Sequence, residues 1–250
     1  MKGKMLLEAL LKRLKLPAVL RFYQELARQA VEANQTYEGY LLALVEAEVQ
    51  QRDENAHKKR IKTARFPVLK TLDQFDFSAV ATLNKAKVLG LAQGDYIERK
   101  ENLILMGNSG TGKTHLAVAL GICACQSGKN VRFYTAAGLI NQLMEYQAAL
   151  RLSQLERSLS RMDLLIIDEV GYVPFSEKGA QLFFQLVAAS YERQSLIMTT
   201  NLEFSKWPEV FGSEQLTGAL LDRLTHHCEI LSMNAESYRF KESISKKKET

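Results

Sequence analysis

The segment from Gly107 to Thr114 has the residue types and the spacing of a phosphate-binding loop. Its sequence, Gly-Asn-Ser-Gly-Thr-Gly-Lys-Thr, fits the pattern G-x-x-x-x-G-K-[ST] at every position. Glycines let backbone N–H groups converge on phosphate oxygens, and the positive end of a following helix faces the same anion. Lys113 would neutralise the β- and γ-phosphates, and the Thr114 hydroxyl would ligate Mg²⁺. The candidate phosphate-binding residues are Gly107, Asn108, Ser109, Gly110, Thr111, Gly112, Lys113 and Thr114, with His115 beside them as a support of the loop.

An acidic pair follows a short apolar run. Four apolar residues, 164–167, predict a buried central strand, and Asp168 would leave its carboxyl end beside the phosphate loop. A carboxylate at that place can hold Mg²⁺, usually through water. The adjacent Glu169 can polarise an attacking water, which favours hydrolysis over phosphoryl transfer to a substrate hydroxyl. The alternative without chemistry is an acidic turn that ends a strand.

Two further polar residues could complete a hydrolytic site. Asn201 follows the run 195–200, and its side chain could contact the γ-phosphate or the attacking water, although Asn also ends many strands in turns. Arg223 lies in the helical segment 219–224 and could act as an arginine finger, which stabilises charge on the transferring phosphoryl group. A surface pair with Asp222 accounts for Arg223 equally well.

Short apolar runs and helical patterns alternate around these residues. The runs predict strands at 102–106, 130–135, 164–167 and 195–200, and helices at 113–126, 137–160 and 176–192. Such alternation predicts an α/β fold, in which helices cover both faces of a parallel sheet. Ligands of such folds gather at the carboxyl ends of the strands, where the candidate residues would lie.

The beginning of the chain has a different pattern and most of the positive charge. Leucines at helical spacing predict a first helix that ends at Pro17, a second follows over 19–30, and Thr36 would cap a third that stops at Phe66. Residues 1–70 hold 14 Lys and Arg against 8 Asp and Glu, whereas the net charge of the whole chain is only +5. This split suggests a polyanion-facing arm. Cations near a helix end also suit its dipole, so a purely structural role stays open for the basic cluster of Lys58, Lys59, Arg60, Lys62 and Arg65.

The composition excludes several classes of protein. With 46% hydrophobic and 24% charged residues, the chain of 250 residues is neither disordered nor collagen-like. Its longest apolar run, 116–125, is about half of the ~20 residues that span a bilayer. Cys123, Cys125 and Cys228 match neither a disulfide framework nor a zinc motif, so we expect a reducing cytoplasm. The pair His226–His227 has no further metal ligand at a useful spacing, so we expect no site there.

The motifs together resemble the IstB family of AAA+ ATPases. Lys113, Asp168–Glu169, Asn201 and Arg223 look like the Walker A, Walker B, sensor 1 and arginine-finger positions of such enzymes. The resemblance covers nearly the whole chain and is carried further by the longer strings 64–77, 168–176, 199–201, 216–224 and 236–239.

This resemblance implies a function that spacing alone does not give. IstB proteins are the ATPase helpers of IS21-type insertion sequences and are related to the helicase loader DnaC and the initiator DnaA. The resemblance implies ATP and Mg²⁺ as cofactors, duplex DNA bound with little sequence preference, a partner transposase, and a homo-oligomer with ATP sites between subunits. Arg223 would then reach a neighbour's γ-phosphate, and Arg239 resembles a further phosphate-sensing arginine.

The fold implied is an AAA+ P-loop NTPase with a small all-α domain before it. We expect a basic helical domain at 1–66, an ATPase domain at 67–245 with a reduced or absent C-terminal lid, and a polar tail at 246–250. The stretch 137–160 falls where relatives carry an extra helix for assembly or DNA contact. The closest alternative function is that of a helicase loader. A metabolite kinase and a DNA-binding scaffold are more distant alternatives. We expect no membrane partner.

Overall fold

The computed structural model describes residues 2–235 and residue 237. The chain divides into two compact units, residues 1–59 and residues 60–250, and the division falls inside the third helix. Arg239, the tail 246–250 and the part of the chain that would form a lid lie outside the described residues.

Three helices build the first unit: α1 (Lys2–Arg13), α2 (Pro17–Glu32) and the first part of α3 (Tyr37–Ala64). They enclose a small core around Leu11, Val19 and Leu44. The predicted cap of α3 is confirmed, because Thr36 Oγ1 accepts a hydrogen bond from the backbone N–H of Gly39 at 3.1 Å. The predicted first helix is present as α1 and ends at Arg13, before Pro17. Pro17 itself begins α2, since the fixed φ of proline suits the first position of a helix.

A buried glutamate caps α2 from another helix. Leu16 precedes α2 and offers no side-chain acceptor to its first amides. Glu48 of α3 takes this role, because its Oε2 accepts from Ala18 N at 2.9 Å and Val19 N at 3.3 Å. Arg52 Nε donates to the other carboxylate oxygen at 2.9 Å. Burial raises the pKa of Glu48, but the hydrogen bonds from Arg52 and the two amides outweigh it, and the pKa is lowered.

The second unit contains a parallel sheet of five strands in the order β2-β3-β4-β1-β5. The predicted α/β class and four predicted strands are confirmed, with β3 longer than expected. The fifth strand was not predicted, because it lies at the sheet edge and only its fourth residue is buried. The strands are β1 (Asn102–Met106), β2 (Val131–Thr135), β3 (Leu164–Val170), β4 (Ser195–Thr200) and β5 (Cys228–Ser232).

Two of the three predicted helices of this unit are confirmed and the third is interrupted. The pattern at 137–160 forms two helices, because the chain turns at Leu150 with φ 56° and the N–H of Arg151 closes back on the carbonyl of Tyr146 at 2.8 Å. No helix among the described residues combines the length and apolar character that a membrane crossing requires. The helices are α4 (Lys85–Ala92), α5 (Asp95–Glu98), α6 (Lys113–Gln126), α7 (Ala136–Ala148), α8 (Leu152–Leu159), α9 (Glu177–Ser190), α10 (Trp207–Phe211) and α11 (Glu214–Thr225), with short 3₁₀ turns at Phe77–Ala79 and Phe204–Lys206.

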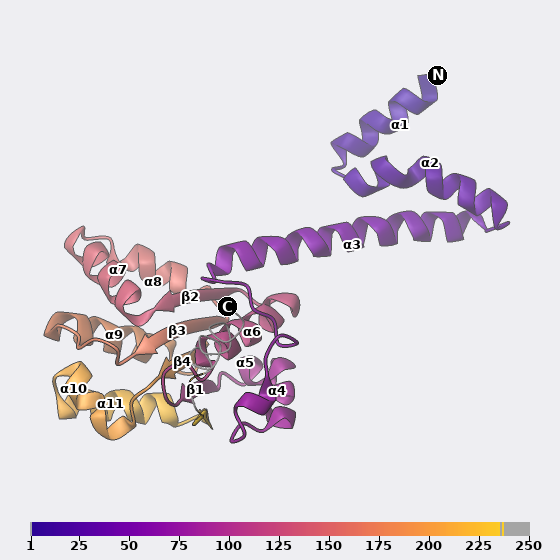
Figure 1. Ribbon diagram of the computed structural model, residues 1–250. Coiled ribbons are helices and arrows are strands. Elements are labelled where there is room, and N and C mark those ends of the chain that lie inside the picture. The colour runs from indigo at the N-terminus through magenta and orange to yellow at the C-terminus, as the bar shows by residue number, and fades with distance from the viewer. Residues whose placement is uncertain (1, 236, 238–250) are drawn as a thin grey trace, which may run out of the picture. The chain divides into compact units, whose positions relative to one another are not determined.

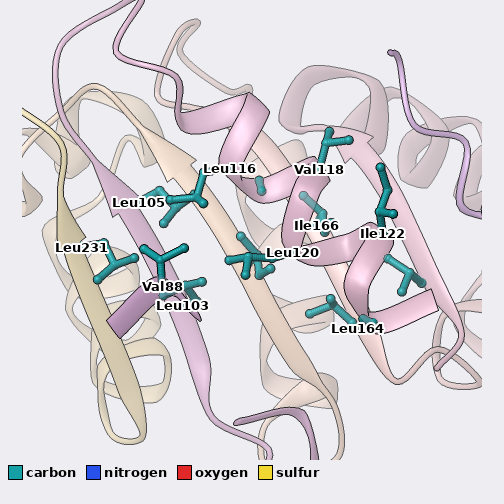
Figure 2. Close-up of a cluster of buried hydrophobic side chains, with 14 of the residues drawn as sticks. Val88, Leu103, Leu105, Leu116, Val118, Leu120, Ile122, Leu164, Ile166 and Leu231 are labelled. Carbon is teal, nitrogen blue, oxygen red and sulfur yellow. The ribbon is translucent and has the colours of Figure 1, made fainter. Parts of the chain in front are cut away.

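Alternate strand residues build two cores, one on each face of the sheet. Ile166 belongs to one core with side chains of α4, α5 and α6, whereas Ile167 belongs to a second core with side chains of α7, α9 and α11. Helices therefore cover both faces of the sheet (Figure 1). Figure 2 shows Leu116 and Leu120 of α6 among the side chains of the strands. A Cβ at Gly121 would lie 2.7 Å from Ile166 Cδ1, so glycine lets α6 approach the sheet closely. This packing fixes α6, and with it the loop that precedes the helix.

Candidate functional site

The predicted phosphate-binding loop connects β1 to α6. Gly112 precedes α6 with φ 91°, a left-handed conformation that suits glycine. A Cβ at Gly107 would lie 2.2 Å from the carbonyl oxygen of Met233, which follows β5, so only glycine fits there. Thr111 Oγ1 donates to the carbonyl of Asn108 at 2.9 Å and closes the loop. The loop therefore has the tight curvature that backbone amides need to surround an anion.

Lys113 is the first residue of α6, and its ammonium lies against the loop. Its Nζ donates to the carbonyls of Gly107 and Asn108, both at 2.7 Å. His115 also lines the cavity described below, and its Nε2 lies 2.9 Å from the carbonyl oxygen of Thr71. Its ring meets that of Phe75 edge-on at 5.2 Å. His115 thus joins α6 to the segment before the sheet.

Asp168 and Thr114 lie together at the carboxyl ends of the strands. The Thr114 hydroxyl is 3.0 Å from both carboxylate oxygens of Asp168. Thr199 Oγ1 of β4 donates to Asp168 Oδ1 at 2.5 Å. Hydroxyl and carboxylate oxygens are the hard ligands that Mg²⁺ prefers, so this pair fits the predicted metal site.

A β-bulge directs Glu169 away from the core. Ile167 pairs with Met198 and Val170 with Thr200, so Asp168 and Glu169 together oppose a single residue of β4. In an uninterrupted strand Glu169 would point to the face that buries Ile167, but Val170 takes that place and Glu169 is exposed. Glu169 has φ 61°, which costs a non-glycine residue roughly 1–2 kcal/mol. Its N–H donates to Thr199 Oγ1 at 2.9 Å, which holds the bulge in place.

One cavity joins the predicted site residues of the phosphate-binding loop, the acidic pair and Asn201. It has a volume of about 690 Å³. Asn201 lines it directly after β4, where the loop after β1 and the end of β3 also arrive. The cavity wall includes Lys113, Thr114, Asp168, Glu169 and Asn201.

A further part of the wall comes from a segment that had no predicted role. Phe75 and Val80 are buried there and give the cavity an apolar side next to Gly112. Asp76 caps the following turn by accepting from Ser78 N at 2.9 Å, and its hydrogen bonds with Ser78 lower the pKa of its carboxyl. The signal in the sequence that could have revealed this part of the wall is the pair of aromatic residues in the string Phe-Asp-Phe at 75–77. The segment's lining residues are Pro67, Val68, Lys70, Gln74, Phe75, Asp76, Ala79 and Val80.

Arg223 does not line this cavity. It lies on α11, where its guanidinium is 5.0 Å from the ring centroid of Phe184 and its Nη1 donates to the carbonyl of Ala219 at 2.8 Å. Within the described part of the chain, no ion pair joins Arg223 to Asp222, as the surface-pair alternative would require.

The basic cluster at the end of α3 has two kinds of member. Arg60 is half-buried, and its Nη1 lies 3.5 Å from the carbonyl of Cys125 near the C-terminus of α6, where a cation suits the helix dipole. The other members are exposed: Lys58, Lys59, Lys62 and Arg65.

Solved structures with the same fold include replication proteins. DnaA from Aquifex aeolicus with bound AMPPCP has a TM-score of 0.58 and 22% identity, and the match covers 74% of this chain and 57% of that one, little more than half its length. The DnaC helicase loader has a TM-score of 0.52 and 20% identity, with 70% of this chain and 99% of that chain covered. The fold is therefore that of an AAA+ P-loop protein, as the sequence predicts.

Sequence relatives are closer. The ATP-binding protein of insertion sequence IS21 from Pseudomonas aeruginosa is 41% identical over 236 residues, which are 94% of this chain and 89% of that protein. The corresponding protein of IS232 from Bacillus thuringiensis is 37% identical over 206 residues, 82% of each chain. The family model described as IstB-like ATP binding protein matches residues 9–246. The phosphate-binding loop and the acidic pair of this site agree with these matches. The chain therefore belongs to the IstB-like ATP-binding proteins associated with insertion sequences.

Proposed function

We propose that this protein binds ATP with Mg²⁺ and hydrolyses it, and that it assists insertion by a partner transposase as a homo-oligomer on duplex DNA. The observation that carries the proposal is the meeting of Lys113, Thr114, Asp168, Glu169 and Asn201 around one cavity. These residues supply the groups that bind phosphate, hold a metal and orient water. The relatives' names, which refer to ATP-binding proteins of insertion sequences, support a role in transposition.

The loop and α6 bind the phosphates of ATP in this proposal. Amides of the loop and the ammonium of Lys113 contact the β- and γ-phosphates, and the helix dipole of α6 adds to the attraction. Thr114 and Asp168 hold Mg²⁺, which when bound neutralises charge on the phosphate oxygens. Phe75 and Val80 provide the apolar surface that a base requires in the same cavity.

Glu169 orients and deprotonates the attacking water. The bulge brings its carboxylate to the cavity while Asp168 stays buried against Thr114 and Thr199. The two neighbouring carboxylates therefore have separate tasks, one toward the metal and one toward water. Asn201 donates a hydrogen bond from its side-chain amide to the γ-phosphate or to the attacking water. The products are ADP and inorganic phosphate, and the proton of the water passes to Glu169.

Arg223 acts on a neighbouring subunit. Because it does not line the cavity of its own chain and is partly exposed on α11, it is available to the ATP site of a second copy. The exposed basic residues at the end of α3 and the net positive charge of residues 1–70 support backbone contacts with duplex DNA.

Phosphate release distinguishes this function from that of a kinase. The full chain is incubated with Mg²⁺-ATP, with and without duplex DNA, and inorganic phosphate is measured. We expect release without any added acceptor, and more of it with duplex DNA. Phosphate release at background, together with phosphorylation of an added nucleoside or metabolite, would contradict the proposal.

The partner decides between transposition and helicase loading. Purified transposase is incubated with donor ends, target plasmid and ATP, with and without this protein. We expect more insertion products when the protein is present. A complex with replicative helicase, without any effect on insertion, would support the helicase-loader alternative.

Mixed oligomers test the action of Arg223. Arg223→Ala subunits lack the finger, whereas Lys113→Ala subunits lack phosphate binding but keep the finger. Each variant alone should be inactive, and a mixture should regain turnover at interfaces that combine an intact cavity with an intact finger. No recovery in a mixture that demonstrably forms mixed oligomers would refute action between subunits.

A further inference from the structure

Two histidines after α11 lie beside a glutamate from the turn between α9 and β4. His226 and His227 directly follow the last residue of α11. Each of them and Glu192 offers a ligand atom, these atoms lie within 4.8 Å of one another, and all three side chains are exposed. Sequence spacing gives the two histidines no third ligand, but the fold supplies one. We infer that Glu192, His226 and His227 bind a divalent transition-metal ion of the zinc class.

A buried asparagine connects the two segments that carry these ligands. The N–H of Asn102, the first residue of β1, donates to the carbonyl of His227 at 2.7 Å, and its side-chain amide donates to the carbonyl of Leu224 at 3.0 Å. Its side-chain oxygen accepts from Leu196 N in β4 at 3.0 Å. The backbone after α11 is therefore held to the beginning of β4, close to Glu192. Preformed ligand positions of this kind lower the entropy that metal binding must overcome.

A tyrosine next to Glu192 orients the first imidazole. The hydroxyl of Tyr191 lies 2.8 Å from Nδ1 of His226. Histidines that bind metals commonly use one ring nitrogen for the metal and the other for such a hydrogen bond. Nε2 of His226 is then the atom left for the metal. The ring of His227 lies beside that of His226, with the two centroids 4.1 Å apart, and both rings offer a ligand atom to the cluster.

The ligand set selects the class of ion. Two imidazoles and one carboxylate form a common zinc set with an open fourth position for water. Imidazole favours zinc, copper and nickel, whereas Mg²⁺ prefers oxygen ligands such as those of Thr114 and Asp168. The C-terminus of α11, which has twelve residues, also directs its negative dipole end toward a cation. The site lies where β4 and β5 begin, at the opposite end of the strands from the ATP cavity, so it is a second metal site.

Cobalt binding tests the proposal on the full chain without nucleotide. Co²⁺ is titrated and its visible absorption is recorded, because this absorption reports the ligands; Zn²⁺ is then added to displace it. The ligand variants are Glu192→Gln, His226→Ala and His227→Ala. His57→Ala, which removes a histidine of the first unit, and Cys228→Ser, which removes the nearest thiol in sequence, are the matched controls.

We expect one saturable Co²⁺ ion per wild-type chain, displaced by Zn²⁺ and without a thiolate charge-transfer band. Each ligand variant should bind more than about 100-fold more weakly, and Tyr191→Phe roughly 10- to 100-fold more weakly, the usual loss for a hydrogen-bond partner of a ligating imidazole. Both controls should match the wild type. Unchanged ATP affinity in the ligand variants shows that they fold. No saturable ion in the wild type, wild-type affinity in His226→Ala, or loss of binding in Cys228→Ser would overturn the assignment.

Discussion

Replacing Thr199 with valine tests how the acidic pair is held in position. The Thr199 hydroxyl donates to Asp168 Oδ1 at 2.5 Å and accepts from Glu169 N at 2.9 Å. A single buried hydroxyl thus connects the carboxylate assigned to the metal with the backbone of the residue assigned to the water. Valine has nearly the same shape, so Thr199→Val removes the two hydrogen bonds and leaves the packing intact.

The expected magnitude follows from these two hydrogen bonds. A hydrogen bond to a charged group contributes about 1.5–3 kcal/mol, and an unpaired buried N–H costs about 1–3 kcal/mol. Because such contributions are not additive between neighbours, we expect Thr199→Val to lower the free energy of unfolding of the second unit by about 2–4 kcal/mol. If the transition state of ATP hydrolysis loses only the hydrogen bond from Thr199 to the Asp168 carboxylate, ATP turnover falls about 10- to 150-fold.

The chain carries its own probe for this measurement. Its single tryptophan, Trp207, is fully buried in α10, so its fluorescence in urea follows the unfolding of the second unit. Thr199→Ser is the matched control, since it keeps the hydroxyl and removes only a methyl group, at a cost of about 0.8 kcal/mol. The reasoning is refuted if the valine and serine variants have the same stability and the same turnover.

Three further predictions concern helix capping, close packing and DNA. The carboxylate of Glu48 caps two amides of α2. Glu48→Gln should speed hydrogen exchange at these amides about tenfold or more, which corresponds to about 1.4 kcal/mol. Because the pKa of Glu48 is lowered on folding, its stabilisation is complete above the usual carboxyl range and is lost as the pH falls through the lowered value. The protection factor of these amides, which is the exchange rate corrected for its intrinsic dependence on pH, should therefore fall in acid in the wild type and not in the variant. Gly121→Ala should destabilise the second unit by about 1–3 kcal/mol, measured by tryptophan fluorescence, because the new methyl group would overlap Ile166; equal stability would contradict the packing argument. Replacing Lys58 and Lys59 with glutamine should reduce the slope of log K against log salt for duplex binding by about 0.9 for each phosphate that these lysines neutralise; an unchanged slope would exclude both residues from the interface.

Local patterns predicted the parts of the fold and site that depend on neighbours in sequence. The loop at 107–114 and the apolar strand before Asp168 are continuous segments, and a parallel sheet then brings their ends to one edge. The break at Leu150 was not predicted, because a left-handed non-glycine residue ends the helix there without any glycine or proline.

Features that depend on distant segments were missed for a physical reason. Phe75 lines the cavity only because the segment before the sheet folds back over Gly112. Glu192 joins His226 only because β4 and β5 both lie beside β1. The bulge that turns Glu169 toward the cavity is a property of strand pairing, which a single strand's sequence does not reveal. Residue types therefore predicted which polar side chains meet at the cavity better than they predicted what surrounds them.

The most direct test of the central claim, ATP hydrolysis at this cavity, compares Glu169→Gln with Glu203→Gln. Both variants make the same chemical change at an exposed glutamate, but Glu203 does not line the cavity. ATP affinity and phosphate release are measured for both with duplex DNA present. Glu169→Gln should keep wild-type ATP affinity and lose turnover by about 10²–10⁴-fold, the usual contribution of a general base, whereas Glu203→Gln should match the wild type. Undiminished phosphate release by Glu169→Gln would contradict the account.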